Sequence, residues 1–135
     1  MGQSVHNYQP YTVSHFGISW LKDKTPPAWP PDPGKAGSGR DFLLRRAFSQ
    51  WDEAQQKGVF LMLGEFGYYQ HTPPSVGMAW LEDNLKICRE RGWGWALWNL
   101  DGAFGIIDSD HVGVDFEDFE GHRLDRKLLE LLKRY

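Results

Sequence analysis

The sequence has little of several features that place a protein in a specialised class. Cys88 is the only cysteine among 135 residues, so no internal disulfide bond can form. No apolar run approaches the roughly 20 residues of a membrane-spanning helix, and residues 1–11 lack the basic and apolar regions of a signal peptide. The net charge of −3 offers no positive field to nucleic acid or to an anionic membrane, so we expect neither partner.

The composition that is present is typical of a soluble, folded domain. Hydrophobic residues make up 41% of the chain and charged residues 24%, and this length normally corresponds to one domain. Seven tryptophans are many for a chain of this size. An indole either fills a core or presents a flat face on which a sugar ring can stack, and composition alone does not separate the two.

The hydrophobic pattern predicts alternating strands and helices. Strands are expected at 4–8, 59–63 and 93–99, and helices at 40–58, 75–92 and 122–135. Asp41 is expected to cap the first helix and Gly58 to end it. The run at 59–63 is continuously apolar, which is typical of a strand buried on both faces. Residues 9–39 are rich in Pro and Gly and are expected to form a long loop.

This alternation predicts a parallel sheet covered by helices, with a ligand site at the carboxyl ends of the strands. No glycine-rich phosphate loop follows any strand, which favours a barrel over an open nucleotide-binding sheet. We expect no cofactor. The acidic segment 108–118 suggests a calcium loop, but Val112 stands where such a loop needs an oxygen ligand, so no metal site is expected.

Polar and aromatic residues stand at the end of each predicted strand. His6 and Tyr8 end the first strand and, being two residues apart, point to the same side. Glu65 follows the second strand, and Trp98 and Asn99 end the third. In a barrel these ends converge on one mouth. A carboxylate beside an imidazole, a phenol and an indole suits glycoside hydrolysis, in which a carboxylate attacks the anomeric carbon.

The same residues also have plain structural interpretations. Glu65 could be a loop residue that binds nearby backbone, and His6 and Tyr8 could form a half-buried structural pair. Trp20 and Trp29 lie in the proline-rich loop, where each would either extend a sugar-binding surface or anchor the loop. The residues alone leave these alternatives open.

Three segments together resemble the C-terminal part of glycoside hydrolase family 5, the cellulase-type retaining glycosidases. They are "VHNYQPYTVSHFG" (5–17), "GEFG" (64–67) and "GWGWALWNLDGAFGIIDS" (92–109). The resemblance implies an α/β fold in which the chain supplies three βα units, strands six to eight, of a TIM (β/α)8 barrel. His6 and Tyr8 match the His-x-Tyr pair of strand six, and Glu65 matches the nucleophile that ends strand seven.

The resemblance also implies which residues bind substrate. Trp98 matches the tryptophan of strand eight that lines the subsite beside the cleaved bond, and Asn99 adjoins it. His15 matches a recurrent position in the loop after strand six. The implied function is hydrolysis of O-glycosidic bonds in a β-linked polysaccharide, by a retaining mechanism. The family's enzymes imply an extracellular or periplasmic location.

One part of the family pattern is missing. The acid/base Glu of the family follows an Asn at the end of strand four, and no Asn-Glu pair occurs in this chain. Retaining hydrolysis needs two carboxyl groups about 5 Å apart. Residues 1–135 are therefore expected to be a partial catalytic domain, a fragment whose exposed sheet edges favour self-association. The alternative is a non-catalytic carbohydrate-binding or interaction module that uses the same aromatic cleft.

Overall fold

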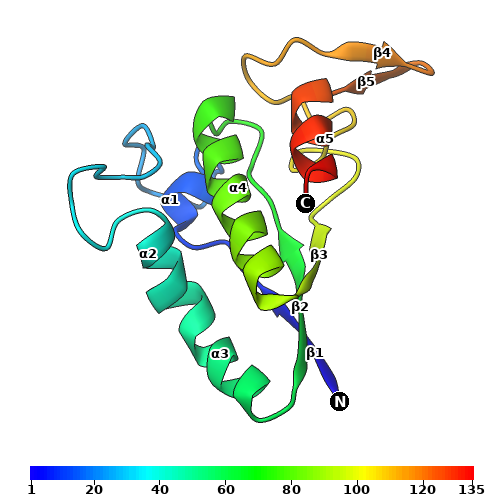
Figure 1. The fold of residues 1–135 in the computed structure, drawn as a ribbon. Helices are drawn as coiled ribbons and strands as arrows, with labels where there is room; N and C mark the ends of the chain where they lie inside the picture. The colour runs from blue at the N-terminus through cyan, green and yellow to red at the C-terminus, as the bar shows by residue number, and fades with distance from the viewer.

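Three parallel strands form the main sheet, in the order β1-β2-β3 (Figure 1). The computed structural model describes residues 1–135. β1 spans Gly2–His6, β2 spans Phe60–Phe66 and β3 spans Gly94–Leu97. Both neighbouring pairs run parallel, each joined by a helical crossover. The alternation of strands and helices predicted from the hydrophobic pattern is therefore confirmed for this part of the chain.

Helices cover one face of this sheet. A continuous helical segment runs through α2 (Arg40–Leu43), a π-helical stretch (Leu44–Phe48) and α3 (Ser49–Gln56), and α4 spans Pro74–Arg91. Figure 1 shows α4 lying along the sheet, with α2 and α3 to one side and α5 (Arg126–Lys133) beyond its far end. None of the helices combines the length and the apolar character needed to cross a bilayer.

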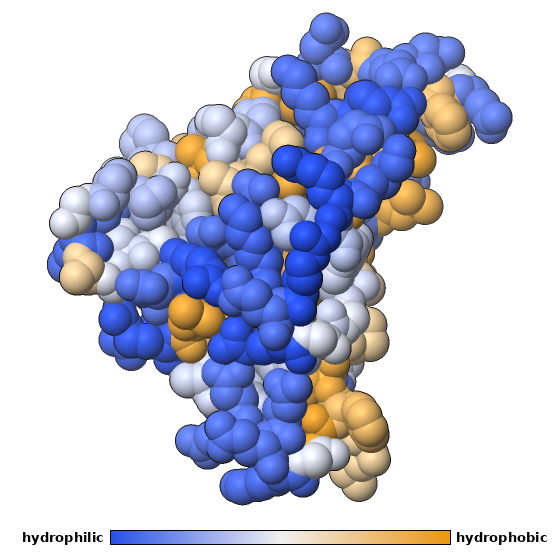
Figure 2. Space-filling model, viewed as in Figure 1, coloured by the Kyte–Doolittle hydropathy of each residue, from blue (hydrophilic) through white to orange (hydrophobic).

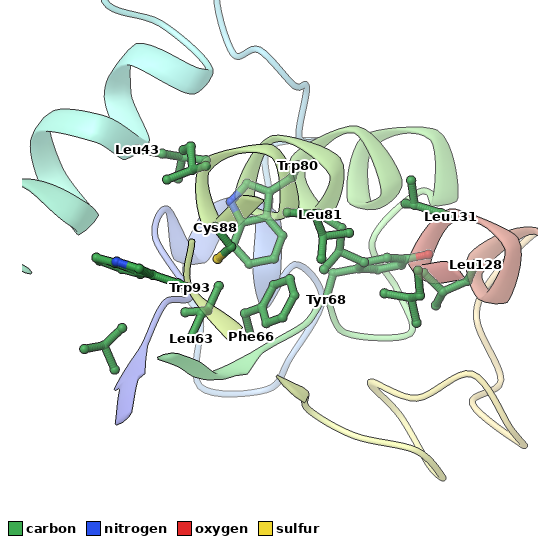
Figure 3. Close-up of a cluster of buried hydrophobic side chains, with 14 of the residues drawn as sticks. Leu43, Leu63, Phe66, Tyr68, Trp80, Leu81, Cys88, Trp93, Leu128 and Leu131 are labelled. Atoms are coloured by element: carbon green, nitrogen blue, oxygen red, sulfur yellow. The ribbon is translucent and has the colours of Figure 1, made fainter. Parts of the chain in front are cut away.

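The core lies between α4 and the helix-covered face of the sheet. Leu63 and Phe66 of β2 meet Trp80 and Leu81 of α4, and all four side chains are fully buried (Figure 3). α5 adds a smaller part of the same core through Leu128, Leu131 and Leu132. Burial of this amphipathic set holds the helices against β2, the central strand.

The opposite face of the sheet is open, so the expectation of a strand buried on both faces was wrong. Leu61 and Leu63 face the helices, whereas Phe60 and Met62 are 80% and 39% exposed. Figure 2 shows hydrophobic surface gathered over the amino-terminal ends of β1 and β2. A cavity of about 240 Å³ lies there, lined by Gly2, Gln3, Ser4, Phe60, Leu61 and Met62. The apolar run alternates between core and open face as any strand does.

The first strand and the first long helix begin and end differently from the prediction. β1 ends at His6, two residues early, because the backbone N–H of Gln9 donates to the Asn7 side chain at 2.9 Å and turns the chain. Gly39, not Asp41, is the N-cap residue of α2, so Asp41 lies inside the first turn. Gly58 has a φ of 82° just after α3, as expected of a helix-ending glycine.

The C-terminal helix is shorter than predicted because a hairpin precedes it. β4 (Glu117–Phe119) pairs antiparallel with β5 (His122–Leu124), so residues 122–124 are strand and not helix. α5 begins only after Asp125, whose carboxylate accepts a 2.9 Å hydrogen bond from the N–H of Leu128. A three-residue strand carries too short a pattern to be separated from an adjoining helix.

The predicted loop at 9–39 contains one short helix, α1 (Tyr11–Ser14), and is otherwise irregular. Its tryptophans have different environments. Trp29 is half-buried, and its indole N–H donates to Asp83 of α4 at 2.9 Å, which anchors the loop. Trp20 is 56% exposed. The anchoring interpretation therefore fits Trp29, and Trp20 remains available for a ligand.

Candidate active site

Glu65 lies near the carboxyl end of β2, at a point where this strand contains one extra residue. Val5 of β1 pairs with Leu63, but the next residue, His6, pairs with Glu65. Gly64 is therefore passed over in the pairing. Such a bulge interrupts the regular alternation of side chains along a strand.

The bulge decides which side of the sheet Glu65 faces. In a regular strand, position 65 would share the helix-covered side with Leu61 and Leu63. After the bulge it is Phe66 that returns to the core, fully buried. Glu65 instead keeps a side chain that is 25% exposed, on the side where His6 lies. The carboxylate thus avoids the hydrophobic core.

The two glycines of the "GEFG" motif allow close approach of the neighbouring strands. A Cβ atom on Gly64 would overlap the hydroxyl of Ser4 on β1, and one on Gly67 would overlap the carbonyl oxygen of Trp98. Trp98 is also tied to β2 directly, because its N–H donates to the carbonyl of Phe66 at 2.8 Å. The motif therefore packs the backbone on either side of Glu65 closely against β1 and against Trp98, the residue after β3.

Two side chains contact the Glu65 carboxylate. The Tyr8 phenol donates a hydrogen bond of 2.7 Å to Oε1, and His6 Nδ1 lies 3.5 Å from Oε2. Burial, followed by the hydrogen bond to Glu65, raises the pKa of Tyr8 well above its usual range. The phenol therefore stays protonated and donates. The predicted side-by-side placement of His6, Tyr8 and Glu65 is present in the structure.

His15 lies behind Tyr8, in a cluster of aromatic rings. Its ring centroid is 4.9 Å from that of Tyr8 and 5.2 Å from that of Phe104, and Ser14 Oγ lies 2.8 Å from its Nδ1. Burial lowers the pKa of His15, which favours the neutral imidazole. Phe104 also contacts Tyr69, with ring centroids 5.4 Å apart. Sequence reasoning missed Phe104 and Tyr69, because a single aromatic residue in a loop carries no periodic signal.

The aromatic cluster continues outward to the surface. The rings of Tyr11 and Trp20 each lie 5.2 Å from His15, centroid to centroid. Tyr11 is 43% exposed and Trp20 is 56% exposed. A continuous row of rings thus runs from the partner of Glu65 to solvent.

Trp98 and Asn99 follow β3, joined by a cis peptide bond. Trp98 is 48% exposed, so its indole is accessible to a ligand. The side-chain oxygen of Asn99 is buried and has no hydrogen-bond partner. Tyr8 and His6 are the predicted site residues that contact the Glu65 carboxylate, and His15 contacts Tyr8; no hydrogen bond joins Asn99 to Glu65. No three His, Cys, Asp or Glu side chains are arranged to hold a metal ion.

Solved structures of glycoside hydrolases share this fold. One glycoside hydrolase is 34% identical, with a TM-score of 0.83, and the match covers 99% of this chain and 42% of that chain. The cellulose synthase subunit Z of Clostridioides difficile is 25% identical, with a TM-score of 0.70, covering 96% of this chain and 39% of that one. The endoglucanase Cel5A of Thermotoga maritima, 19% identical with a TM-score of 0.69, matches 97% of this chain and 38% of its own.

The chain spans about two fifths of the length of these structures. No protein-family model matches the sequence, and no curated protein matches it in sequence. The neighbours are described as a glycoside hydrolase, endoglucanases and a cellulose synthase subunit. The α/β architecture, with its parallel sheet, is the one that these enzymes share over the matched region.

Proposed function

We propose that this chain carries the nucleophile of a retaining β-glycosidase, and that Glu65 attacks the anomeric carbon of the sugar. The observation that carries the proposal is the 2.7 Å hydrogen bond from Tyr8 to Glu65, with His6 3.5 Å from the other carboxylate oxygen. A donor on the carboxylate fixes its direction and favours its charged form. The 34% identity to a glycoside hydrolase supports the same proposal.

The proposed reaction has two steps. An oxygen of Glu65 bonds to the anomeric carbon while the glycosidic C–O bond breaks, and the leaving oxygen keeps the electron pair of that bond and takes a proton from a general acid. Water then attacks the anomeric carbon of the glycosyl ester and gives a proton back to the former general acid, while the bond from the sugar to Glu65 breaks and restores the carboxylate. We propose that the general acid is a carboxyl group on a part of the barrel outside residues 1–135.

We further propose that residues 1–135 are part of a catalytic domain of glycoside hydrolase family 5 type. In this proposal β1, β2 and β3 are strands six to eight of a (β/α)8 barrel. The open face of the sheet, with Phe60 and Met62 exposed, would then face the barrel interior. β1 and β3 are the edges of the sheet, where further strands would pair. The match to about two fifths of longer enzymes supports this placement.

The proposed substrate is a β-linked polysaccharide. Trp98, 48% exposed, offers a flat face just after β3, and Trp20 offers another at the outer end of the aromatic row. His15 lies between Tyr8 and Trp20, and we propose that it shapes the substrate cleft. Aromatic faces of this kind stack on sugar rings and contribute apolar contact that a hydroxyl-rich ligand otherwise lacks. Asn99 is proposed to contact the sugar from the position after Trp98.

A non-catalytic carbohydrate-binding module is the second candidate. The exposure of Trp98 and Trp20 favours it, because both indoles are able to bind sugar without any chemistry at Glu65. This candidate needs no second carboxyl group. It differs from the first in one measurable respect, which is that no covalent bond to the sugar forms.

Covalent trapping separates the two candidates. A dinitrophenyl 2-deoxy-2-fluoro-β-cellobioside has a leaving group that departs without protonation, so trapping requires only the nucleophile. We expect the protein mass to rise by one glycosyl unit, with the label on Glu65 in peptide mapping. Glu65→Gln should abolish labelling. Glu53, an exposed residue of α3, is the control, and Glu53→Gln should leave labelling unchanged. Binding of cello-oligosaccharides with no mass change would favour the binding module.

We also propose that the isolated chain self-associates through its sheet edges. β1 and β3 each present unpaired backbone N–H and C=O groups, and the adjoining face exposes Phe60 and Met62. An edge strand with apolar neighbours is a template for pairing with a second copy.

A further inference from the structure

Tyr8 lies between two residues that are both held by α4. On one side, the Asn7 side-chain N–H donates to Asn84 Oδ1 at 2.6 Å. On the other side, the carbonyl of Gln9 accepts a 2.9 Å hydrogen bond from the indole N–H of Trp80. The backbone that carries Tyr8 is therefore fixed before and after it, from a helix on the far side of the sheet.

A closed ring of hydrogen bonds joins four residues, which we call the α4 clamp: Asn7, Gln9, Trp80 and Asn84. Asn7 Oδ1 accepts from the N–H of Gln9 at 2.9 Å, and the Asn84 side-chain N–H donates to the carbonyl of Trp80 at 2.8 Å. Asn7 is 4% exposed, and Asn84 and Trp80 are fully buried. Hydrogen bonds in such a dry site are strong, and breaking one leaves a costly unpartnered group.

The clamp is also connected to the strand of Glu65. The backbone N–H of Asn7 donates to the carbonyl of Glu65 at 3.0 Å. The amide of Asn7 thus points to β2 while its side chain points to α4. Because successive residues alternate sides, the next side chain, Tyr8, is directed to the open side, where it reaches the carboxylate at 2.7 Å.

We propose that Asn84 and Trp80 are positioning residues that aim the Tyr8 phenol at Glu65, an inference that rests on the proposed role of Glu65. Apolar side chains of similar size would fill the same space without desolvating two amides. The hydrogen bonds add directional restraint, because those from α4 hold Asn7 and Gln9 in place on either side of Tyr8. Neither residue is hydrogen-bonded to the carboxylate, so their proposed effect passes through residues 7–9, the segment that carries Tyr8.

The positioning is testable by NMR on the intact chain, with tyrosine labelled with ¹³C at Cζ. Tyr8→Phe identifies the Tyr8 resonance, and Glu65→Gln gives its position when the phenol no longer donates to a carboxylate. We expect Asn84→Leu to move the Tyr8 resonance by at least half of that change. Trp80→Phe, which removes the indole N–H donor together with part of the buried ring, should move it in the same direction.

Thr72→Val is the matched control. Thr72 is fully buried and its hydroxyl donates to the carbonyl of Val13 at 2.7 Å, so the change also removes a buried hydrogen bond but outside the clamp. It should leave the Tyr8 resonance in place. If both Trp80→Phe and a folded Asn84→Leu keep the wild-type resonance, the positioning role is wrong. Should Asn84→Leu not fold, Trp80→Phe alone decides.

A second readout links the clamp to the proposed chemistry. In covalent trapping by the fluoro-glycoside, Asn84→Leu should slow labelling of Glu65 about as much as Tyr8→Phe, and the double variant should be no slower than Tyr8→Phe alone. Additive losses in the double variant would overturn the inference. If the wild-type chain is not trapped at all, the proposed nucleophile fails, whereas the NMR result still decides the positioning.

Discussion

The phenol of Tyr8 donates a 2.7 Å hydrogen bond to Glu65, although 57 positions separate the two residues in the chain. The bond depends on the parallel pairing of β1 with β2, in which His6 is opposite Glu65. It also depends on a phenol that keeps its proton, because burial and the carboxylate raise the pKa of Tyr8. Changes at either residue should therefore act on the same chemical step.

Tyr8→Phe should weaken the nucleophile without unfolding the protein. The phenol fixes the direction of the carboxylate, and we expect the loss of this orientation to raise the barrier by about as much as one hydrogen bond to a charged group, about 1.5–3 kcal/mol, so the rate of trapping at Glu65 should fall by about tenfold to a hundredfold. The rate is measured by mass spectrometry against time. Tyr11→Phe is the control, since Tyr11 is 43% exposed and lies on the outer part of the aromatic row. Equal rates for Tyr8→Phe and the wild type would remove Tyr8 from the site.

Gly67→Ala should destabilise the fold because its Cβ would overlap the carbonyl oxygen of Trp98. The Trp98 oxygen and the Cα that would carry the new Cβ both belong to the backbone, so neither can move aside easily. We expect the free energy of unfolding to fall by about 1–3 kcal/mol. Urea unfolding followed by tryptophan fluorescence measures it. At Gly94 the added Cβ would lie 3.9 Å from the Cβ of Met62, an ordinary contact, so Gly94→Ala should be tolerated. Equal stabilities of the two variants would contradict the close approach.

His15 should make the protein less stable as the pH falls. Burial lowers its pKa in the folded state, so the unfolded chain, with an ordinary pKa of about 6.5, takes up the proton first. Stability is therefore lost as the pH drops below about 6.5 and levels off below the folded pKa. Comparing urea unfolding at about pH 7.5 and 5.5, His15→Gln should show a smaller loss than the wild type.

His122 provides a comparison of opposite sign. Its hydrogen bond to Asp108 raises the pKa of His122, so its contribution is present below the unfolded pKa and lost as the pH rises through the folded one. His122→Gln should therefore make stability rise more steeply with pH than in the wild type. If both variants change the slope of stability against pH in the same direction, burial does not control the pKa of His15.

Phe60→Glu should reduce self-association of the isolated chain. Phe60 is 80% exposed on the open face beside the sheet edge, and a charge there opposes the approach of a second copy. Light scattering over a concentration series should show a shift toward the monomer. Phe119→Glu is the control, because Phe119 is also exposed, at 45%, but lies on the β4–β5 hairpin. A wild-type chain that stays monomeric throughout would contradict the proposal.

Local patterns in the sequence predicted the order of strands and helices well. The helix at α4 and its end at Gly92 followed from apolar spacing and a glycine, both of which act over a few residues. The placement of Glu65 beside His6 and Tyr8 was predicted from strand ends and from resemblance. The β4–β5 hairpin was not, because three-residue strands carry too little pattern.

Other features depend on contacts between distant segments and leave no local signal. Phe104 joins the aromatic cluster only because the loop after β3 folds back on Tyr8 and His15. Asn84 is one polar residue on a helix, where a solvated position is the ordinary expectation. Its burial against Asn7 follows from the way α4 lies over the sheet.

Gly64, which has no partner in the pairing of β1 with β2, decides which face of the sheet the residues after it point to. Along β2, odd-numbered positions face the core up to Leu63, and beyond the extra residue the even-numbered Phe66 does so. Without the bulge, a regular strand of the same sequence would put position 65 in step with Leu61 and Leu63, and the carboxylate would lie against α4. The side on which the carboxylate lies is therefore set by the number of residues between Leu63 and Phe66 as much as by their kinds.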